Sequence, residues 1–362
     1  MNVIMEHAAQ LQAAGHEVCF IAETLPSPEN YVRFPILNKC HTFNYRTARK
    51  ECFDVLSVTF WPLIYPALNW QWKSIFQLIQ GIDYQSIQSP CLRRMAQAVL
   101  ALDLPGVTVS EFISNTLKND CARNPDKLVI VRNGIDKKIF HPQPASRPDI
   151  TECFRVLVEG PVDVPFKNVE AALRIARNGG ADEVWLLTSS DITSHPLADR
   201  VFVQIPHEQT ADIYRACHLL VKTSRFEGMC LPPLEMFHCN GCAVLYELPS
   251  LREYAADMVN SLLVAQDDED TAAAAVQRIK NDPDLYAALT AGALHTAQTW
   301  PDQTTSGKLF IRYIEQLPPA DCDLIKKTIR QLVKKHFPAL LLWRLRRWAR
   351  RTLNLFKQIL CQ

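Results

Sequence analysis

TSRFEGMCLPPLEMFHCNGC, residues 223–242, is the stretch that decides the fold. The apolar residues 219–221 just before it predict a buried strand, and Pro232 and Pro233 predict the start of a helix with Glu235 in its first turn. Glu227 and Gly228 lie in the loop between them. A strand end, a loop and a helix N-terminus bind anions in an open α/β sheet, because the first N–H groups of a helix have no intrahelical partner. The stretch therefore predicts an α/β fold with a ligand site at this loop.

Predicted strands and helices alternate on both sides of this stretch, which favours parallel sheets. Apolar runs predict strands at residues 16–21, 73–82, 107–109, 128–132, 154–159, 183–188, 201–205, 219–222, 243–246 and 262–264. The run 54–65 predicts a further strand that ends at Trp61 and Pro62, because proline cannot continue the ladder. The spacing of apolar residues predicts helices at residues 3–14, 89–102, 110–117, 168–178, 210–216, 271–280 and 284–298.

The chain is long enough for two domains, because 362 residues exceed the size at which a single core stops growing. Residues 141–149 contain three prolines and no apolar period, so we place the linker there. We predict doubly wound domains at residues 1–145 and 150–300, a helix at 301–320 that returns toward the first domain, and a tail at 321–362. Doubly wound domains open with a strand and a Gly-rich turn, whereas this sequence opens with a helix, so we expect the first strand to be missing.

The composition argues against several classes of protein. The 12 cysteines are scattered and many lie in apolar runs, which is typical of reduced thiols in a cytoplasmic protein. Cys239 and Cys242 form a CxxC motif without a second pair or a histidine at zinc spacing, so we interpret them as core residues and expect no metal site. No apolar run approaches the length of about 18 residues that spans a membrane, and residues 1–10 do not resemble a secretory signal.

The charges are unevenly distributed. Residues 321–362 contain 11 Lys and Arg against 2 Asp and Glu, whereas the first 320 residues contain 28 against 36. In this tail the basic residues interleave with Trp, Leu and other apolar residues, as in LLLWRLRRWARR at residues 340–351. Such a helix is suited to an anionic membrane surface. Packing of the tail on the acidic body is the alternative, and any nucleic-acid binding would depend on the tail alone.

Two glutamates and a lysine are candidate ligand-binding residues. A carboxylate such as Glu227 in a loop can accept hydrogen bonds from sugar hydroxyls, and one in the following helix, Glu235, can accept both protons of a ribose cis-diol. Lys167 precedes the predicted helix 168–178 and is a point charge suited to a diphosphate. Alternatively, Glu227 is a solvated loop residue, Glu235 only stabilises the first turn of the helix, and Lys167 is an ordinary exposed lysine.

A second candidate site follows the predicted strand 73–82. Gln80, Asp83 and Tyr84 lie at its C-terminal end, where α/β folds place their ligands. The alternative is an ordinary strand end whose polar groups are satisfied by neighbours.

These residues lie in segments that resemble glycosyltransferase family 4, whose members have the GT-B fold of two Rossmann-like domains facing a cleft. In the second half the likeness is carried by VEGPVDVPFKNVEAAL from Val158, VFVQIPHEQTADIY from Val201 and LLVKTSRFEGMCLPPLEMFHCNGCAVL from Leu219. In the first half it is carried by HEVCFIAE, TFWPLIYP, VTVSEFIS and VIVRNGIDKKIFHP. The likeness covers about residues 1–317.

The resemblance implies transfer of a sugar, with retention, from a nucleoside diphosphate sugar to a glycan or lipid-linked acceptor, without a metal ion or other cofactor. By that likeness Lys167 holds the diphosphate, Glu227 the transferred sugar and Glu235 the ribose. The implied catalytic residues are Glu227, Lys167 and Asp83. The implied donor site also includes Gly160, Asn168, Gly228, Met229, Cys230 and Leu231, and the implied acceptor side consists of Gln80, Asp83 and Tyr84.

Three features depart from the family pattern. The opening strand and Gly-rich loop are missing, residues 161–166 lack the arginine that usually accompanies the phosphate lysine, and Gln80 stands where a histidine is common. They are compatible with an incomplete reading frame, a specialised subfamily or a weakened enzyme.

We predict an enzyme of cell-surface polysaccharide or glycolipid synthesis, peripheral on the cytoplasmic face of the inner membrane, that does not bind nucleic acid. The alternative is a non-catalytic or truncated GT-B protein that acts as a membrane-associated partner in a glycan assembly complex.

Overall fold

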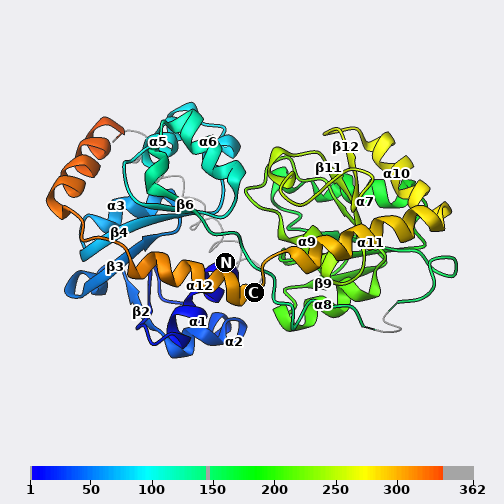
Figure 1. Ribbon diagram of the computed structural model, residues 1–362, viewed down its shortest axis with the longest axis horizontal. Coiled ribbons are helices and arrows are strands. Elements are labelled where there is room, and N and C mark those ends of the chain that lie inside the picture. The colour runs from blue at the N-terminus through cyan, green and yellow to red at the C-terminus, as the bar shows by residue number, and fades with distance from the viewer. Residues whose placement is uncertain (1, 144–146, 337–362) are drawn as a thin grey trace, which may run out of the picture. The chain divides into compact units, whose positions relative to one another are not determined.

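The computed structural model describes residues 2–143 and 147–336, which divide into two compact units. Unit 1 comprises residues 2–10, 109–112 and the described part of 131–310, and unit 2 comprises residues 11–108, 113–130 and 311–336. Both units are α/β with parallel strands (Figure 1). The domain ranges expected from the sequence stay predictions.

Unit 1 is built on a six-stranded parallel sheet with the order β12-β11-β10-β7-β8-β9. Its strands are β7 (Arg155–Glu159), β8 (Glu183–Thr188), β9 (Arg200–Val203), β10 (Leu219–Lys222), β11 (Cys242–Tyr246) and β12 (Ser261–Val264). Its helices are α7 (Val169–Asn178), α8 (His207–Ala216), α9 (Leu231–His238), α10 (Glu269–Asn281) and α11 (Pro283–Thr299). β7 and β10 are neighbours in the middle of the sheet. The chain adds β8 and β9 beside β7 on one side and β11 and β12 beside β10 on the other, so the strand order reverses between β7 and β10.

Alternate residues of these strands enter two cores, one on each face of the sheet. Leu157, Leu220 and Leu245 pack with α8 and α9, whereas Val158 and Val244 pack with α7 and α10. Both faces are covered by helices, as a parallel sheet requires (Figure 1).

The CxxC cysteines enter different cores, since Cys239 belongs to the α8 and α9 side and Cys242 to the α7 and α10 side. Both thiols are free and fully buried, and burial raises the pKa of each to about 12. The two thiols are core residues, as the sequence predicts.

Unit 2 contains a four-stranded parallel sheet with the order β3-β4-β5-β6 and a separate parallel pair, β1-β2. The strands are β1 (Cys19–Ala22), β2 (His41–Asn44), β3 (Cys52–Val58), β4 (Gln71–Ile79), β5 (Gly106–Thr108) and β6 (Leu128–Ile130). The helices are α2 (Pro28–Arg33), α3 (Ile64–Ala67), α4 (Asp83–Ser86), α5 (Pro90–Leu100) and α6 (Glu111–Cys121), the last of which begins in unit 1. Two further helices, α1 (Asn2–Ala13) and α12 (Gln303–Glu315), contribute residues to both units.

The structure shortens the strand that the sequence predicted to end at Trp61 and Pro62. β3 ends at Val58, and Trp61–Leu63 form a 3-10 turn that leads directly into α3. Pro62 lies in this turn, because proline cannot donate to a strand ladder but fits the first turn of a helix, where its N–H has no partner to lose. The segment 23–51, for which the sequence indicated no element, contains α2 and β2.

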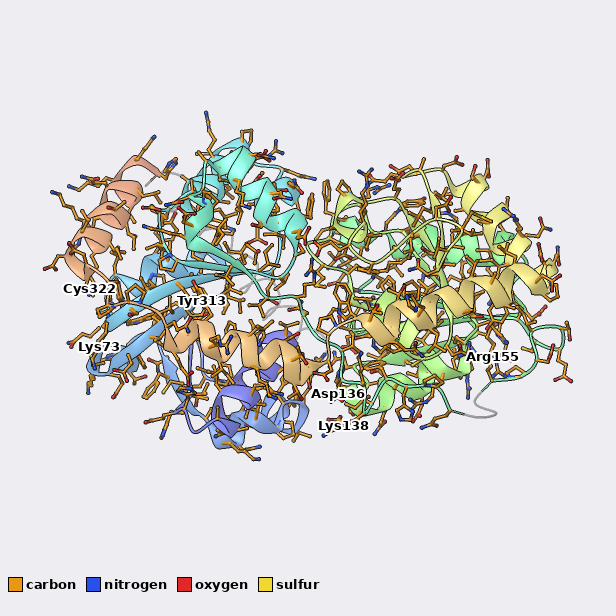
Figure 2. All side chains as sticks on the ribbon, in the orientation of Figure 1. Lys73, Asp136, Lys138, Arg155, Tyr313 and Cys322 are labelled. Carbon is orange, nitrogen blue, oxygen red and sulfur yellow. The ribbon has the colours of Figure 1, made fainter. Side chains whose placement is uncertain are left out.

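The described part of the tail packs on unit 2. Residues 322–336 are helical, and Ile329 within them is fully buried. Lys326 Nζ donates to the carbonyl of Trp70 at 2.9 Å and lies 5.4 Å from the centre of the Trp72 ring. Cys322 lies close to Lys73 in Figure 2, beside β4, and its Sγ contacts the carbonyl of Trp72 at 3.0 Å. The arginine-rich stretch at 340–351 lies outside the described residues.

None of the helices in residues 2–143 and 147–336 is long and apolar enough to cross a membrane.

Candidate functional site

Two loops meet where the strand order of unit 1 reverses. One follows β7 and runs through the 3-10 turn Pro165–Lys167 to α7, and the other follows β10 and runs to α9. Arg225 donates its backbone N–H to the carbonyl of Phe166 at 2.8 Å, and Thr223 Oγ1 donates to the carbonyl of Asn168 at 2.7 Å. Ligands of open α/β sheets bind beyond the carboxyl ends of the strands at such a reversal.

Lys167 and Glu227 face each other across these loops. Lys167 Nζ donates to both carboxylate oxygens of Glu227, at 2.8 and 3.0 Å. The lysine side chain is 23% exposed and that of the glutamate 9%, so water screens this pair only partly. The structure therefore brings together the residues that the sequence proposed for the diphosphate and the transferred sugar.

Gly160 and Asn168 shape the backbone around this pair. Gly160 has a φ of +143°, which side-chain-bearing residues rarely adopt. Asn168 has a φ of +53°, which is uncommon for any residue except glycine, and it occupies the N-cap position of α7 without a side-chain capping bond. Its Nδ2 is buried and has no hydrogen-bond partner among the described residues, and the same holds for Ser224 Oγ in the second loop. Buried polar atoms without a partner are a feature of ligand sites.

The turn Gly228–Leu231 leads into α9. Ser110 Oγ donates to the carbonyl of Gly228 at 2.8 Å, and Tyr254 Oη donates to that of Cys230 at 2.6 Å. These two bonds fix carbonyls of the turn. Met229 is partly exposed, and Cys230 is buried and precedes the first residue of the helix.

Glu235 lies one residue deeper in α9 than the sequence predicted. The helix begins at Leu231, so Glu235 is its fifth residue and no acid occupies the first turn. Pro232 sits at the second position, which proline tolerates because N–H groups of the first turn are unpaired. The alternative of a first-turn acid that merely favours the helix dipole is therefore wrong for this residue.

The carboxyl of Glu235 is unusually hard to ionise. Burial raises its pKa from the usual 4.5 to about 8, and the charges of Glu159 and Glu6 add to the rise, whereas a hydrogen bond with Tyr214 lowers it. Tyr214 comes from α8 and Glu6 from α1, so elements far apart in the sequence set the state of this carboxyl. A strongly shifted pKa beside a ligand loop is typical of functional residues.

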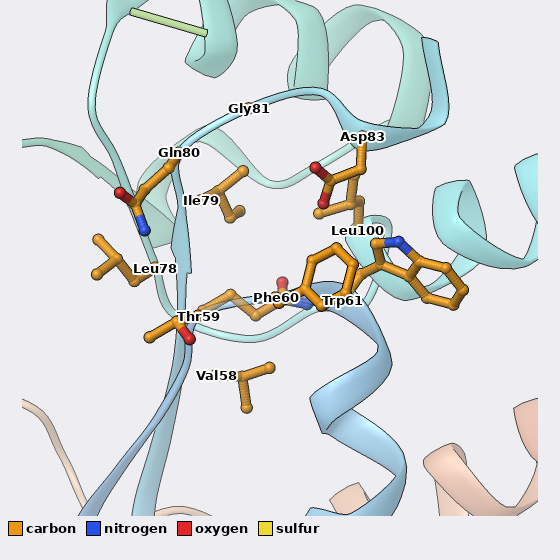
Figure 3. A pocket seen from close by; sticks show the side chains of 11 residues that line it. Val58, Thr59, Phe60, Trp61, Leu78, Ile79, Gln80, Gly81, Asp83 and Leu100 are labelled. Atoms are coloured by element: carbon orange, nitrogen blue, oxygen red, sulfur yellow. The ribbon is translucent and has the colours of Figure 1, made fainter. Parts of the chain in front are cut away.

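Unit 2 has a pocket at the carboxyl ends of β3 and β4 (Figure 3). Gln80 and Asp83 both line it, together with residues that the sequence did not indicate, Phe60 and Trp61. In Figure 3 the carboxyl of Asp83 lies on the side of the two aromatic rings and Gln80 on the side of Leu78 and Thr59. Phe60 is 46% exposed, and its ring centre lies 6.0 Å from that of Trp61. Aromatic walls with a few polar groups are typical of small-molecule sites.

Asp83 and Tyr84 differ in their surroundings. Burial raises the pKa of Asp83 to about 6. Tyr84 does not line the pocket, and its hydroxyl donates to Asp120 Oδ2 of α6 at 2.8 Å. The structure therefore groups two of the three residues proposed for this side and places the third against another helix.

Within residues 2–143 and 147–336, no three His, Cys, Asp or Glu side chains come together as metal ligands.

A chain with two parallel-sheet units and this loop-and-helix arrangement at a strand-order reversal has the GT-B fold. Residues 188–295 match the family model of Glycosyl transferases group 1. This region contains the second loop, Glu227 and Glu235. A curated relative, the D-inositol 3-phosphate glycosyltransferase of Thermobispora bispora, is 28% identical over 220 residues, which are 53% of this chain and 51% of the relative. The chain thus spans about half the length of that relative.

Solved structures with the same fold match most of the chain. Sucrose-phosphate synthase from Thermosynechococcus elongatus superimposes with a TM-score of 0.69 at 17% identity, covering 86% of this chain and 91% of that protein. HepE from Anabaena, solved in complex with UDP and glucose, superimposes with a TM-score of 0.70 at 13% identity, covering 87% of this chain and 95% of that protein. At these identities the likeness establishes the fold alone.

Proposed function

We propose that this chain is a glycosyltransferase that moves a sugar from a nucleoside diphosphate sugar to a glycan or lipid-linked acceptor. The observation that carries the proposal is the Lys167–Glu227 pair at the strand-order reversal, beside α9 and Glu235. The match to Glycosyl transferases group 1 covers two of these residues, and HepE, which shares the fold, was solved with UDP and glucose. That this chain also binds a nucleoside diphosphate sugar is part of the proposal.

The donor chemistry follows from the charges at the site. When the sugar leaves, the bond between its anomeric carbon and the phosphate oxygen breaks, and the diphosphate gains negative charge. Lys167 and the N–H groups at the start of α9 are fixed donors for that charge, and fixed donors stabilise a transition state without reorganisation. Glu227 accepts hydrogen bonds from the sugar hydroxyls and Glu235 from the ribose. We propose that these groups suffice without a metal ion and that the sugar keeps its anomeric configuration.

In unit 2 we propose that the pocket of Gln80, Asp83 and Phe60 receives the acceptor. A sugar ring can stack on the exposed face of Phe60. Asp83, with a pKa of about 6, is mostly ionised at neutral pH and close enough to neutrality to take the proton of an acceptor hydroxyl.

A test of this function measures nucleotide release from a panel of nucleotide sugars, with Glu227→Gln, Lys167→Ala and a control, Glu269→Gln. Glu269 forms an ion pair with Arg174 at 2.6 Å on the same unit. We expect Glu227→Gln and Lys167→Ala each to lower turnover by roughly 10²-fold or more and the control to leave it unchanged. Variants that turn over like the parent would contradict the proposal. Nucleotide binding by the parent without any turnover would favour the non-catalytic partner of a glycan assembly complex.

We also propose that the basic tail, residues 321–362, brings the protein to an anionic membrane on the cytoplasmic side, in cell-surface polysaccharide or glycolipid synthesis. The support is the interleaving of Trp and Leu with Arg in residues 340–351. The full chain should sediment with vesicles that contain anionic lipid and not with neutral vesicles. Replacing Arg344, Arg346 and Arg347 by Gln should abolish the difference, whereas Lys327→Gln in the described helix should not. Equal sedimentation with anionic and with neutral vesicles would contradict the proposed membrane binding.

A further inference from the structure

Unit 2 contains a basic segment, residues 25–51, in a body that is otherwise acidic. The segment has five Lys or Arg against two Asp or Glu, whereas the first 320 residues as a whole have 28 against 36. Its two acids, Glu29 and Glu51, stand near its ends. Lys73 and Lys127 of the same unit are each paired with an aspartate. By contrast, five exposed cations of the segment form no ion pair within residues 2–143 and 147–336, namely Arg33, Lys39, Arg46, Arg49 and Lys50.

The basic segment is folded, so these cations have defined positions. It contains α2, β2 and two 3-10 turns at 35–39 and 47–50 (Figure 1). The side-chain oxygens of Tyr31 and Thr42 lie 3.1 Å apart and join α2 to β2. Asn44 Oδ1 accepts the backbone N–H groups of Arg46 and Thr47, both at 2.9 Å, and so fixes the start of the second turn.

The inner side of the segment is anchored to the four-stranded sheet of unit 2. The ring centre of Phe43 lies 6.2 Å from that of Phe53 in β3. The Tyr45 ring centre lies 5.5 Å from that of Trp70, whose Nε1 donates to the carbonyl of Tyr45 at 3.3 Å. Trp70 also accepts the hydrogen bond of Lys326, so the basic segment and the described part of the tail meet at this residue.

The outer side of the segment exposes aliphatic side chains beside the cations. α2 buries none of its residues, and Val32 in it is 82% exposed. Leu25, just before the helix, is 54% exposed. Lys and Arg next to exposed aliphatic residues are suited to the boundary between the headgroups and acyl chains of an anionic bilayer. A soluble polyanion offers a partner to the cations alone.

We propose that residues 25–51 form a second membrane contact, in which the five cations meet anionic headgroups and Val32 and Leu25 enter the interface. This inference depends on the proposed membrane binding, since it adds a surface of folded unit 2 to the contact made by the tail. Each contact alone is weak, and two contacts in one chain bind more tightly than either by itself. The segment thereby fixes which end of unit 2 faces the bilayer.

The experiment measures hydrogen exchange of the full chain, together with its sedimentation, in the presence of three probes. These are vesicles of phosphatidylglycerol and phosphatidylcholine, vesicles of phosphatidylcholine alone, and soluble polyphosphate. We expect the mixed vesicles to slow exchange in residues 25–51 and the neutral vesicles to leave it unchanged. Hydrogen exchange locates the contact, so it separates binding by the segment from binding by the tail alone.

Two triple variants with the same loss of charge test the cations. Changing Arg46, Arg49 and Lys50 to Gln should weaken binding to the mixed vesicles by roughly 10- to 100-fold, because each Lys or Arg near an anionic surface adds to the attraction. The control changes three cations of unit 1 to Gln, Lys138, Arg278 and Lys308, which are exposed and likewise unpaired in the described part of the chain. This control should weaken binding by less than about twofold, since salt screens distant charges.

A third variant, Val32→Ser, tests whether the partner is lipid. It should weaken vesicle binding by roughly three- to tenfold, because less apolar surface is buried, and leave polyphosphate binding unchanged.

Three results would overturn the inference and leave the tail contact intact. They are unchanged exchange in residues 25–51 when the chain is bound to vesicles, equal losses in the two triple variants, and slowed exchange with polyphosphate but not with the mixed vesicles. A parent chain that does not sediment with the mixed vesicles would overturn both the inference and the proposed membrane binding, whereas the proposed sugar transfer is tested separately by nucleotide release.

Discussion

Glu235→Gln provides the sharpest test of the donor site, because one carboxyl should produce two pH dependences of opposite sign. The pKa of this carboxyl is about 8 in the folded protein and 4.5 in an ordinary setting. A raised folded-state pKa contributes stability that is complete below pH 4.5 and is lost as the pH rises through 8. Between pH 6 and pH 8 these two values predict a loss of about 2 kcal/mol from this residue alone, which is a fall in Tm of roughly 4–8 °C for a unit of this size.

Nucleotide affinity should change in the other direction. A ribose cis-diol donates two protons, so it binds best when Glu235 is ionised, and binding lowers the pKa of this carboxyl. If the complex restores a pKa near 4.5, a nucleotide sugar such as UDP-glucose should bind up to about 50-fold more tightly at pH 8 than at pH 6. A nucleotide sugar is the suitable probe because its diphosphate has no group that titrates in this range.

The assay is a thermal unfolding series at pH 6, 7 and 8, with and without the nucleotide sugar, for the parent and two variants. In Glu235→Gln both pH dependences attributed to this residue should disappear, since an amide does not titrate. Glu208→Gln on the exposed face of α8 is the control and should behave as the parent does. Parallel pH curves for the parent and Glu235→Gln would refute the reasoning about burial. A nucleotide affinity that falls with pH in the parent alone would refute the ribose role.

Three further perturbations follow from the described contacts. Asp83→Asn should lower turnover by about 10²-fold or more. In the parent, protonation of Asp83 should make the rate decline below pH 6, and this decline should be absent in the variant. A variant whose pH–rate profile keeps the decline would exclude Asp83 as the base. Gly160→Ala should cost about 1–3 kcal/mol in urea unfolding and also weaken diphosphate binding, whereas Gly180→Ala, at a φ of +79° with open space around it, should lose stability only. Lys326→Ala should lower the free energy of unfolding of unit 2 by about 1–2 kcal/mol, because its hydrogen bond is lost. The same change at the exposed neighbour, Lys327→Ala, should alter stability in urea little. Equal effects of the two changes would mean that residues 322–336 do not pack on unit 2 as described.

The elements of unit 1 could be predicted from the sequence because its strands are short, clearly bounded and, except for β9, mostly buried. The predicted strand at 183–188 coincides with β8, and the predicted helix at 168–178 begins one residue before α7. A buried parallel strand is a continuous apolar run, and here Gly179 and Gly180 separate the helix from that strand. Unit 2 was harder to predict, since β1 and β2 are short and only partly buried and carry a weak pattern.

Side-chain environments in the site depend on strand order, which periodicity does not reveal. β7 and β10 are neighbours although β8 and β9 lie between them in the chain, so the contact of Lys222 with Glu159 appears only once the order is known. The state of Glu235 likewise depends on Tyr214 and Glu6. Glu227 and Lys167 could each be recognised from the sequence as candidates, by residue type and by their place in loops after predicted strands, but their pairing appears only in the structure.

Lys167 and Lys222 both lie beside Gly160, which explains why this site needs its glutamates before any ligand arrives. Like charges along one glycine would repel each other strongly in a partly buried setting, and Glu159 and Glu227 each neutralise one lysine. The two pairs are not equivalent. Lys222 is 4% exposed and donates to a carbonyl as well as a carboxylate, whereas Lys167 is 23% exposed and donates to the carboxylate of Glu227. A diphosphate therefore competes most readily for Lys167, and the carboxylate it displaces is the one that the proposed function assigns to the sugar hydroxyls.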